Sequence, residues 1–261
     1  MLQRFDYKKG KSNLKRRLQD LRIQMQLKGL QGYLVPRADF FQGEYVAPHD
    51  ERLAFLTGFS GSAGFCCVLM KKAAIFIDGR YRIQVKQEVS NSYEIVHWPE
   101  KQLWQWLNDN ISNGKIGYDP DLHTTSEIEN LETNLFSNNV SLLKAEGLID
   151  LIWKDQPPYE DTNVIEQPHK FAGKTSLAKC KEVADILQNE NQDQCILTDP
   201  ESISWLLNIR GNDVPRTPVV HACAVIDSMG NVDLFIELNK LNTYTLENVP
   251  HVTIYSFSKF K

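Results

Sequence analysis

The sequence predicts an α/β protein of two related domains, each a mixed β-sheet flanked by helices, and three observations indicate this fold class. Strand-like apolar runs alternate with amphipathic helical segments, which favours parallel strands joined by helices. Two apolar runs meet closely around Lys71-Lys72 and are typical of a hairpin, so the sheet is expected to be mixed. After a proline-containing interruption the same succession restarts, which indicates an internal repeat.

The first domain is expected to span residues 1–156. Its first helix, over 14–27, has Leu14, Leu18 and Leu21 at helical spacing, with basic side chains on the solvent side. A strand at 32–36 and a short helix near 50–55 precede the hairpin. The later strands are expected at 65–70, 73–78, 93–98, 115–118 and 140–144, and the later helices at 80–89, 101–111 and 126–136.

Residues 157–173 are expected to form a linker, because they contain few apolar residues and two proline interruptions. The second domain, 174–261, follows it. Its elements are expected as a helix at 174–189, a strand at 194–198, a helix at 203–209, strands at 219–226 and 231–237, a helix at 238–248 and a strand at 251–257.

The two domains match in order and in side-chain type. Cys66-Cys67-Val68-Leu69 matches Ala222-Cys223-Ala224-Val225, and Ile75-Phe76-Ile77-Asp78 matches Leu234-Phe235-Ile236-Glu237. In the second copy, no counterpart follows for the last two helix–strand units of the first. We therefore expect the second domain to be incomplete, with a sheet edge and sheet faces left uncovered.

Composition and charge favour a globular protein and exclude several classes of partner. Of the 261 residues, 42% are hydrophobic and 24% charged, as in folded domains. A net charge of −4 gives no electrostatic footprint for nucleic acid. No apolar run approaches the roughly 18 residues that span a bilayer, and no apolar signal segment follows Met1. The 5 cysteines form no CxxC pair and are expected to be reduced, packed thiols, which indicates the cytosol.

Two motifs resemble ligand sites but are better explained as local structure. The segment Asp119-Pro120-Asp121-Leu122-His123 contains side chains that suit zinc or manganese. A turn followed by Thr124 as helix N-cap explains the same residues. Gly173-Lys174-Thr175 ends like a phosphate loop, but Pro168 stands where an earlier glycine is required.

The glycine-rich segment 58–64 fits neither a nucleotide-binding nor a nucleophile motif, and its small residues are expected to allow a tight turn. His49, Asp50 and the serines Ser60 and Ser62 do not define a hydrolase triad, because nothing fixes their geometry. Asp50 is expected instead to cap the turn that follows it. Neither an HExxH motif nor a carboxylate–histidine cluster for two metals occurs, so no catalytic residue and no metal ligand is assigned.

Arg52, Arg80, Arg210 and Asp213 are candidates for a substrate-access role. Arg210 and Asp213 directly follow the apolar run 205–207. A local explanation is that Gly211 ends the helix while Asp213 pairs with Arg210 or caps the turn. The alternative places these residues at the mouth of a neighbouring site, because arginine binds carboxylates through two contacts and these side chains can then touch a peptide.

Ordered motifs along almost the whole chain carry a resemblance to a known family. They include Glu44-Tyr45-Val46-Ala47-Pro48, Gly58-Phe59-Ser60-Gly61-Ser62-Ala63-Gly64, Asp78-Gly79-Arg80-Tyr81 and Ile203-Ser204-Trp205-Leu206-Leu207-Asn208-Ile209-Arg210-Gly211-Asn212-Asp213-Val214. In this order they resemble the amino-terminal and partial middle domains of Xaa-Pro aminopeptidases. The resemblance is to the large, three-domain cytosolic type within the creatinase/prolidase superfamily, metallopeptidase family M24.

The resemblance implies two creatinase-N-terminal-like domains with a ribonuclease-H-like sheet. The family hydrolyses the N-terminal residue from peptides with proline in second position. It uses two divalent metal ions, usually manganese, held in a carboxy-terminal domain whose ligand positions this chain lacks. This portion is therefore expected to be inactive alone, to hold no cofactor, and to shape substrate access and assembly.

The resemblance also implies the partners. These are the enzyme's own catalytic domain, short proline-containing peptides and, in the full-length enzyme, a second copy in a homodimer. Neither nucleic acid nor a membrane is expected, and the location is cytoplasmic. The alternative function is a stand-alone creatinase-fold module that binds a protein or peptide without enzymatic activity.

Overall fold

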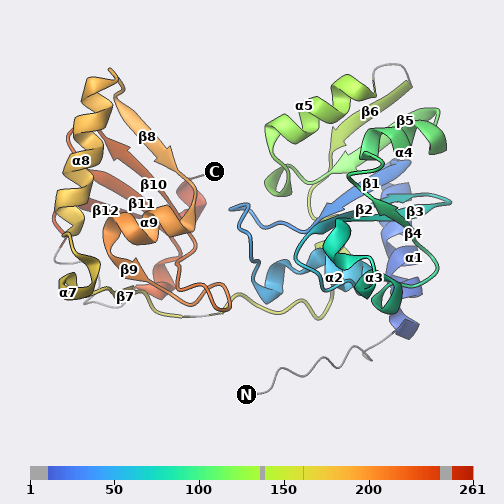
Figure 1. Ribbon diagram of the computed structural model, residues 1–261, viewed down its shortest axis with the longest axis horizontal. Helices are drawn as coiled ribbons and strands as arrows, with labels where there is room; N and C mark the ends of the chain where they lie inside the picture. The colour runs from blue at the N-terminus through green and yellow to red at the C-terminus, as the bar shows by residue number, and fades with distance from the viewer. Residues whose placement is uncertain (1–10, 136–138, 161, 242–248, 261) are drawn as a thin grey trace. The chain divides into compact units, whose positions relative to one another are not determined.

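The structure is a computed structural model that describes residues 11–135, 139–160, 162–241 and 249–260 (Figure 1). The chain divides into two compact units. The first comprises Met1–Glu44 and Pro48–Pro157, and the second comprises Tyr45–Ala47 and Pro158–Lys261. The short segment Tyr45–Ala47 is thus grouped with the second unit, although it lies inside the predicted first domain.

The first unit contains a 6-stranded mixed sheet in the order β4-β3-β2-β1-β5-β6. Strand β2 is antiparallel to both of its neighbours, and the remaining pairs are parallel. The predicted hairpin is confirmed, with Val68 opposite Ala73. The strands are β1 (Gly32–Pro36), β2 (Gly64–Leu69), β3 (Ala73–Ile77), β4 (Glu94–His97), β5 (Asn113–Tyr118) and β6 (Asn139–Lys144).

Helices cover both faces of this sheet. Alternation along β1 explains the layers, because Tyr33 and Val35 enter one apolar core and Leu34 enters the other. The first core also contains side chains of α1 (Lys11–Leu27), α2 (Arg52–Thr57), α3 (Gln84–Glu88) and α6 (Leu148–Ile152). The second contains side chains of α4 (Leu103–Asn110) and α5 (Thr125–Asn134).

The predicted helix over 80–89 is divided in the structure. A 3-10 turn, η2 (Gly79–Tyr81), precedes the short helix α3 (Gln84–Glu88). Asp78 starts the turn by accepting a hydrogen bond from the Arg80 backbone N–H at 2.8 Å. Val89 then adopts an extended conformation and ends the helix. The single predicted helix is therefore a 3-10 turn capped by Asp78 followed by a short α-helix that ends at Val89.

The second unit contains a 4-stranded sheet in the order β12-β11-β10-β8 and a 2-stranded sheet of β7 and β9. Within the predicted linker 157–173 lie strand β7 and helix α7, so this stretch carries regular structure. The strands are β7 (Ile165–Glu166), β8 (Gln194–Leu197), β9 (Ile209–Arg210), β10 (Ala222–Asp227), β11 (Val232–Ile236) and β12 (Val252–Ser256). The helices are α7 (His169–Ala172), α8 (Ser176–Asn189) and α9 (Pro200–Leu207).

Helix α9 begins three residues earlier than predicted and ends before β9. Asp199 is its N-cap, accepting from the Ser202 N–H at 2.8 Å, and Pro200 occupies the first turn. Asn208 ends it in the left-handed conformation, with φ of 53°. The expected helix at 238–248 begins as the 3-10 turn η4 (Leu238–Lys240), and residues 242–248 lie outside the described part.

The two sheets repeat one topology, as the internal repeat predicts. Strands β8, β10, β11 and β12 have the same pairings and directions as β1, β2, β3 and β4. The register differs from the sequence match: Cys66 lies opposite Ile75, but Ala222 lies opposite Ile236 rather than Leu234. A shift of two residues keeps every side chain on its face of the sheet.

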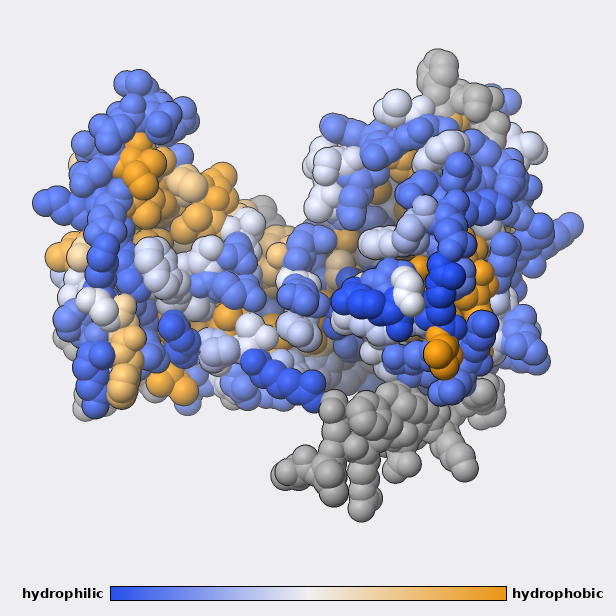
Figure 2. Space-filling model, viewed as in Figure 1, coloured by the Kyte–Doolittle hydropathy of each residue, from blue (hydrophilic) through white to orange (hydrophobic). Residues whose placement is uncertain are grey.

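Within the described residues, β8 has a neighbouring strand on one side only, whereas its counterpart β1 also pairs with β5. Exposed hydrophobic side chains on α8 and β8 include Ile186 and Ile196, and Figure 2 shows hydrophobic surface over these elements. In the part of the chain that the structure describes, no helix combines the length and the apolar character required to cross a bilayer.

Candidate functional site

Arg52, the first of the predicted residues, lies in a buried ion-pair cluster of the first unit. Its Nε and Nη2 donate to the two carboxylate oxygens of Asp150 at 2.8 and 3.0 Å, and Nη1 donates to Asp50 at 2.8 Å. Burial by itself lowers the pKa of Arg52, but the hydrogen bonds and charges of Asp150 and Asp50 outweigh it and raise that pKa. The arginine therefore joins the start of α2 to α6. Asp150 takes up the Nε and Nη2 donors of Arg52, the pair through which a guanidinium binds a carboxylate in two-point fashion.

Asp50 corrects one expectation. The sequence predicts that it caps the following turn, but helix α2 has Glu51 at its N-cap without a side-chain cap bond. Asp50 is buried and binds Arg52 instead. The contact between Arg52 and Asp50 joins two ionised groups, which makes it one of the stronger kinds of hydrogen bond.

Arg80 is the exposed member of the predicted set. Its Nε and Nη2 donate to Asp78 at 2.9 and 2.6 Å. The hydrogen bonds from Arg80 hold the pKa of Asp78 below its usual value. The side chain is 65% exposed, so one face of this guanidinium can meet a ligand from solvent.

Arg210 and Asp213 lie in the second unit, and their contacts are with other groups, so the Arg210–Asp213 pair, one of the two local explanations, is not formed. Arg210 donates through Nη1 to the carbonyl oxygens of Ser204 and Ile209 at 2.9 and 2.7 Å, where it caps the end of α9. Asp213 is buried and contacts Nζ of Lys240 at 2.7 Å. No local sequence signal indicates this partner, because Lys240 lies in another element.

Asp213 accepts two further hydrogen bonds. The His221 backbone N–H donates to Oδ2 at 2.6 Å, and the Thr162 hydroxyl donates to Oδ1 at 3.0 Å. Asp213 thus joins three segments of the second unit. Such a fully paired buried carboxylate acts as a structural anchor.

The metal-like segment 119–123 forms the predicted turn and cap. Asp119 accepts from the backbone N–H groups of Asp121 and Gly147 at 3.0 and 2.9 Å. Thr124 and Glu127 form a reciprocal capping box at the start of α5. Within the described residues, no group of three or more His, Cys, Asp and Glu side chains is placed to hold a metal ion.

The glycine-rich turn holds the serines in local hydrogen bonds. Ser60 donates to Glu88 through its hydroxyl at 2.7 Å and through its backbone N–H at 2.9 Å. The Ser62 hydroxyl lies 2.6 Å from the Tyr81 hydroxyl. Gly58 ends α2 with φ of 81°, a conformation that glycine adopts without strain.

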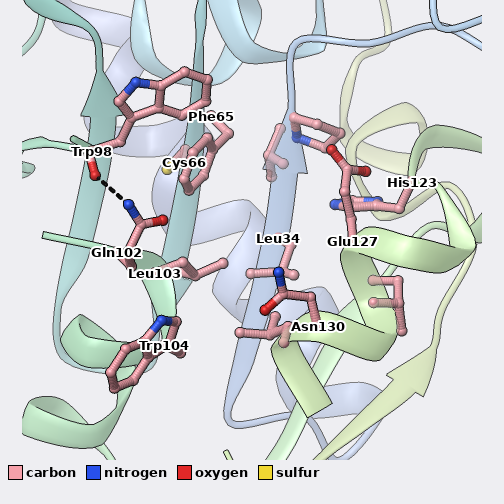
Figure 3. Close-up of a pocket in the computed structure, with 14 residues that line it drawn as sticks. Leu34, Phe65, Cys66, Trp98, Gln102, Leu103, Trp104, His123, Glu127 and Asn130 are labelled. Atoms are coloured by element: carbon pink, nitrogen blue, oxygen red, sulfur yellow. Dashed lines mark hydrogen bonds between the residues drawn. The ribbon is translucent and has the colours of Figure 1, made fainter. Parts of the chain in front are cut away.

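A cavity of about 250 Å³, which the sequence does not indicate, opens in the first unit between α4 and α5 (Figure 3). Pro36 ends β1, Trp98 follows β4 and His123 follows β5, and these three strands run in the same direction. The cavity therefore lies at the carboxyl ends of parallel strands, where ligands bind in open α/β sheets. The cavity could have been anticipated only by applying this rule for ligand sites to residues 36, 98 and 123, which lie at or after the ends of predicted strands.

The floor of the cavity is apolar and its walls are mixed. Figure 3 shows Gln102, Leu103 and Trp104 on the α4 side, His123, Glu127 and Asn130 on the α5 side, and Leu34 between them. Phe65 and Cys66 complete the floor from β2. Such an arrangement of apolar surface with a few polar groups is typical of small-molecule sites.

His123 is held in one tautomer. Its Nδ1 lies 3.0 Å from the carbonyl oxygen of Asp119, which can only accept, so Nδ1 carries the proton and Nε2 is an acceptor. Burial lowers the pKa of His123, which favours the neutral ring.

Comparison with known proteins matches both halves of the chain. The family model described as the creatinase/prolidase N-terminal domain matches residues 17–152, and a second model with the same description matches residues 155–261. A "Probable Xaa-Pro aminopeptidase P" of Pyricularia oryzae is 35% identical over 250 residues, covering 92% of this chain and 40% of that protein. The protein of the same name from Neosartorya fischeri is 37% identical, covering 92% of this chain and 37% of that protein.

A solved structure is similar over almost all of the chain. The X-prolyl aminopeptidase of Caenorhabditis elegans, described as a cytosolic enzyme with a di-nuclear active site, superimposes with a TM-score of 0.88 at 26% identity. The match covers 95% of this chain and 43% of that enzyme. The chain thus spans about two fifths of the length of the proteins that it matches.

Proposed function

Because the chain belongs to the creatinase/prolidase N-terminal domain family, we propose that it is the non-catalytic amino-terminal portion of a Xaa-Pro aminopeptidase. The observation that carries the proposal is the extent of the match: relatives of this name align over 92% of the chain but only about 40% of their own length. The remaining length of such an enzyme is the place for its catalytic domain.

The proposed parent enzyme removes the N-terminal residue from peptides with proline in second position. Its metal ions, two divalent ions that we propose to be manganese, belong to the catalytic domain. The residues described here do not fit such a site, since they provide no cluster of three metal-ligating side chains. We therefore derive no catalytic step through a metal, and the 261-residue chain alone is expected to be inactive.

The proposed role of this portion is to shape substrate access and to support assembly in the cytoplasm. Arg52, Arg80, Arg210 and Asp213 stay candidates for cleft-facing positions. Arg80 is the most available of them, because its side chain is 65% exposed. The proposed partners are the catalytic domain of the same enzyme, short proline-containing peptides and a second copy in a homodimer.

The experiment is a fluorogenic Xaa-Pro peptide assay with added Mn²⁺. The purified 261-residue protein, shown to be folded by circular dichroism, is expected to give no turnover, while a full-length family enzyme gives turnover in the same buffer. Mixing the chain with a separately expressed catalytic domain of a relative then tests assembly. Turnover by the chain alone overturns the proposal, and stable peptide binding without any binding of the catalytic domain favours the stand-alone module.

A further inference from the structure

The proposed function assigns no role to the cavity between α4 and α5. It lies wholly in the first unit, and none of the four substrate-access candidates lines it. Its described lining contains one ionisable carboxylate, that of Glu127, and neither lysine nor arginine. The charge of the lining is therefore complementary to a cation rather than an anion.

An anionic ligand is the natural alternative, because α4 and α5 both begin at the cavity and helix N-termini attract anions. Both helix starts are, however, closed by side chains of the chain itself. Glu127 Oε2 accepts from the Thr124 N–H at 2.9 Å, and Thr124 accepts from the Glu127 N–H at 3.2 Å. Gln105 accepts from the Gln102 N–H at 2.8 Å. An anion would also meet the Glu127 carboxylate.

Acceptor atoms remain available at the α5 side of the cavity. Oε1 of Glu127 has no hydrogen bond to any described residue, and Nε2 of His123 is an acceptor in the tautomer set by Asp119. Figure 3 shows both side chains on the same wall. Two acceptors on one wall suit a ligand that donates several N–H groups, as a protonated primary amine does.

Aromatic side chains form the opposite part of the cavity. The rings of Phe65 and Trp98 lie 5.9 Å apart between centroids, and Trp98 is 40% exposed. Trp104 adds a third ring from α4. Aromatic faces bind both apolar groups and cations.

We propose that this cavity binds a small primary ammonium joined to an apolar ring or chain. The ammonium lies at Glu127 and His123, and the apolar part packs on Phe65, Trp98 and Leu34. A volume of about 250 Å³ is slightly below the range of about 300–1,000 Å³ for small-molecule sites, so the ligand has a single ring or a comparable chain. A free amine and the N-terminal residue of an apolar peptide share this chemistry.

The experiment titrates phenethylamine into the ¹⁵N-labelled 261-residue protein and follows the indole N–H signals by NMR. Saturable shifts of the Trp98 and Trp104 signals are expected, with the Trp205 signal of the second unit unchanged. Phenylacetate carries the same ring with the opposite charge and is expected to cause no shift. Equal binding of phenylacetate, shifts confined to Trp205, or no shift at 20 mM phenethylamine would each overturn the proposal.

Two matched variants test the carboxylate. Glu127→Gln removes its charge but keeps a side chain that serves a capping box, so the fold is preserved. Glu129→Gln is the control: Glu129 lies on the same helix as Glu127, but its carboxylate does not line the cavity. Glu127→Gln is expected to raise the Kd for phenethylamine at least tenfold, and Glu129→Gln to change it less than twofold. Equal effects of the two variants contradict the proposal.

Two dipeptides distinguish the sources of the amine. Phenylalanyl-alanine amide with a free N-terminus is expected to shift the same signals, and its N-acetylated form is not. Binding tighter than that of phenethylamine identifies a peptide N-terminus as the ligand, and weaker binding identifies a free amine. Equal binding of the acetylated form overturns the proposal. Because none of these measurements involves peptide hydrolysis, their outcome is independent of the proposed function.

Discussion

Replacing Arg52 by methionine is expected to destabilise the first unit. The arginine side chain is 10% exposed and its partner Asp50 is 2% exposed, with 2.8 Å between Nη1 and Oδ1. Without the guanidinium, the Asp50 carboxylate stays buried beside an apolar side chain. Breaking a buried ion pair in this way costs about 3–5 kcal/mol.

The second partner of Arg52, Asp150, moves the expected loss toward the lower end of this range. The Asp150 side chain is 33% exposed, so water replaces part of its lost interaction. We therefore expect a loss of about 3 kcal/mol in the free energy of unfolding. With a urea slope of about 2 kcal/mol per M, the unfolding midpoint falls by about 1.5 M.

Tryptophan fluorescence in a urea titration measures this change. Trp153 ends α6 and its ring stacks on Phe55 of α2 at 4.6 Å, so it reports on the helices that Arg52 joins. Arg80→Met is the matched control, because it removes an arginine that is ion-paired in the same unit but exposed. It is expected to leave the midpoint unchanged within error.

A midpoint for Arg52→Met within about 0.3 M of the wild type would refute the reasoning, since a buried pair would then contribute no more than an exposed one. Such a result would favour a substrate-facing role for Arg52. Equal losses for the two variants would show that exposure does not decide the effect.

Three further expectations concern other buried groups. Lys240→Met should destabilise the second unit by about 3 kcal/mol in thermal or urea unfolding, and adding Asp213→Asn should recover part of the loss; a double variant no more stable than the single one would contradict the pairing. Burial lowers the pKa of His123, so the unfolded state takes up a proton on this ring more readily than the folded state does. The folded protein therefore keeps its full stability above the unfolded-state pKa of about 6.5 and loses stability as the pH falls below it. His123→Gln should therefore reduce the loss of stability between about pH 7.5 and 5.5, and an unchanged pH profile would refute this. Burial also raises the pKa of the Cys66 thiol, which makes this thiol unreactive in the native protein. A thiol reagent should therefore label the half-buried Cys195 before Cys66, as measured by mass spectrometry of the labelled peptides, and earlier labelling of Cys66 would contradict this.

Elements specified by neighbouring residues could be predicted from the sequence. The hairpin at Lys71-Lys72 and the N-cap Thr124 depend on side chains within a few positions of each other. The repeat of one sheet topology also followed from the order of apolar runs. Local hydrogen bonds and periodicity determine these features, so they need no knowledge of distant contacts.

The boundaries of short elements were less predictable. The stretch 157–173 reads as a linker, yet Ile165 pairs with Arg210 in a 2-stranded sheet. Two residues of strand carry too little pattern to be recognised, and their pairing depends on a partner far along the chain.

Only the tertiary structure decided the partners of the charged side chains and the existence of the cavity. Arg52 meets Asp150 across 98 positions of sequence, and Asp213 meets Lys240 rather than the nearby Arg210. His123, Glu127, Phe65 and Trp98 become neighbours because strands β1, β4 and β5 end at one edge of the sheet. The sequence determined the longer helices and strands, while long-range packing, which the periodicity of any one segment does not encode, determined the shortest elements and which side chains meet.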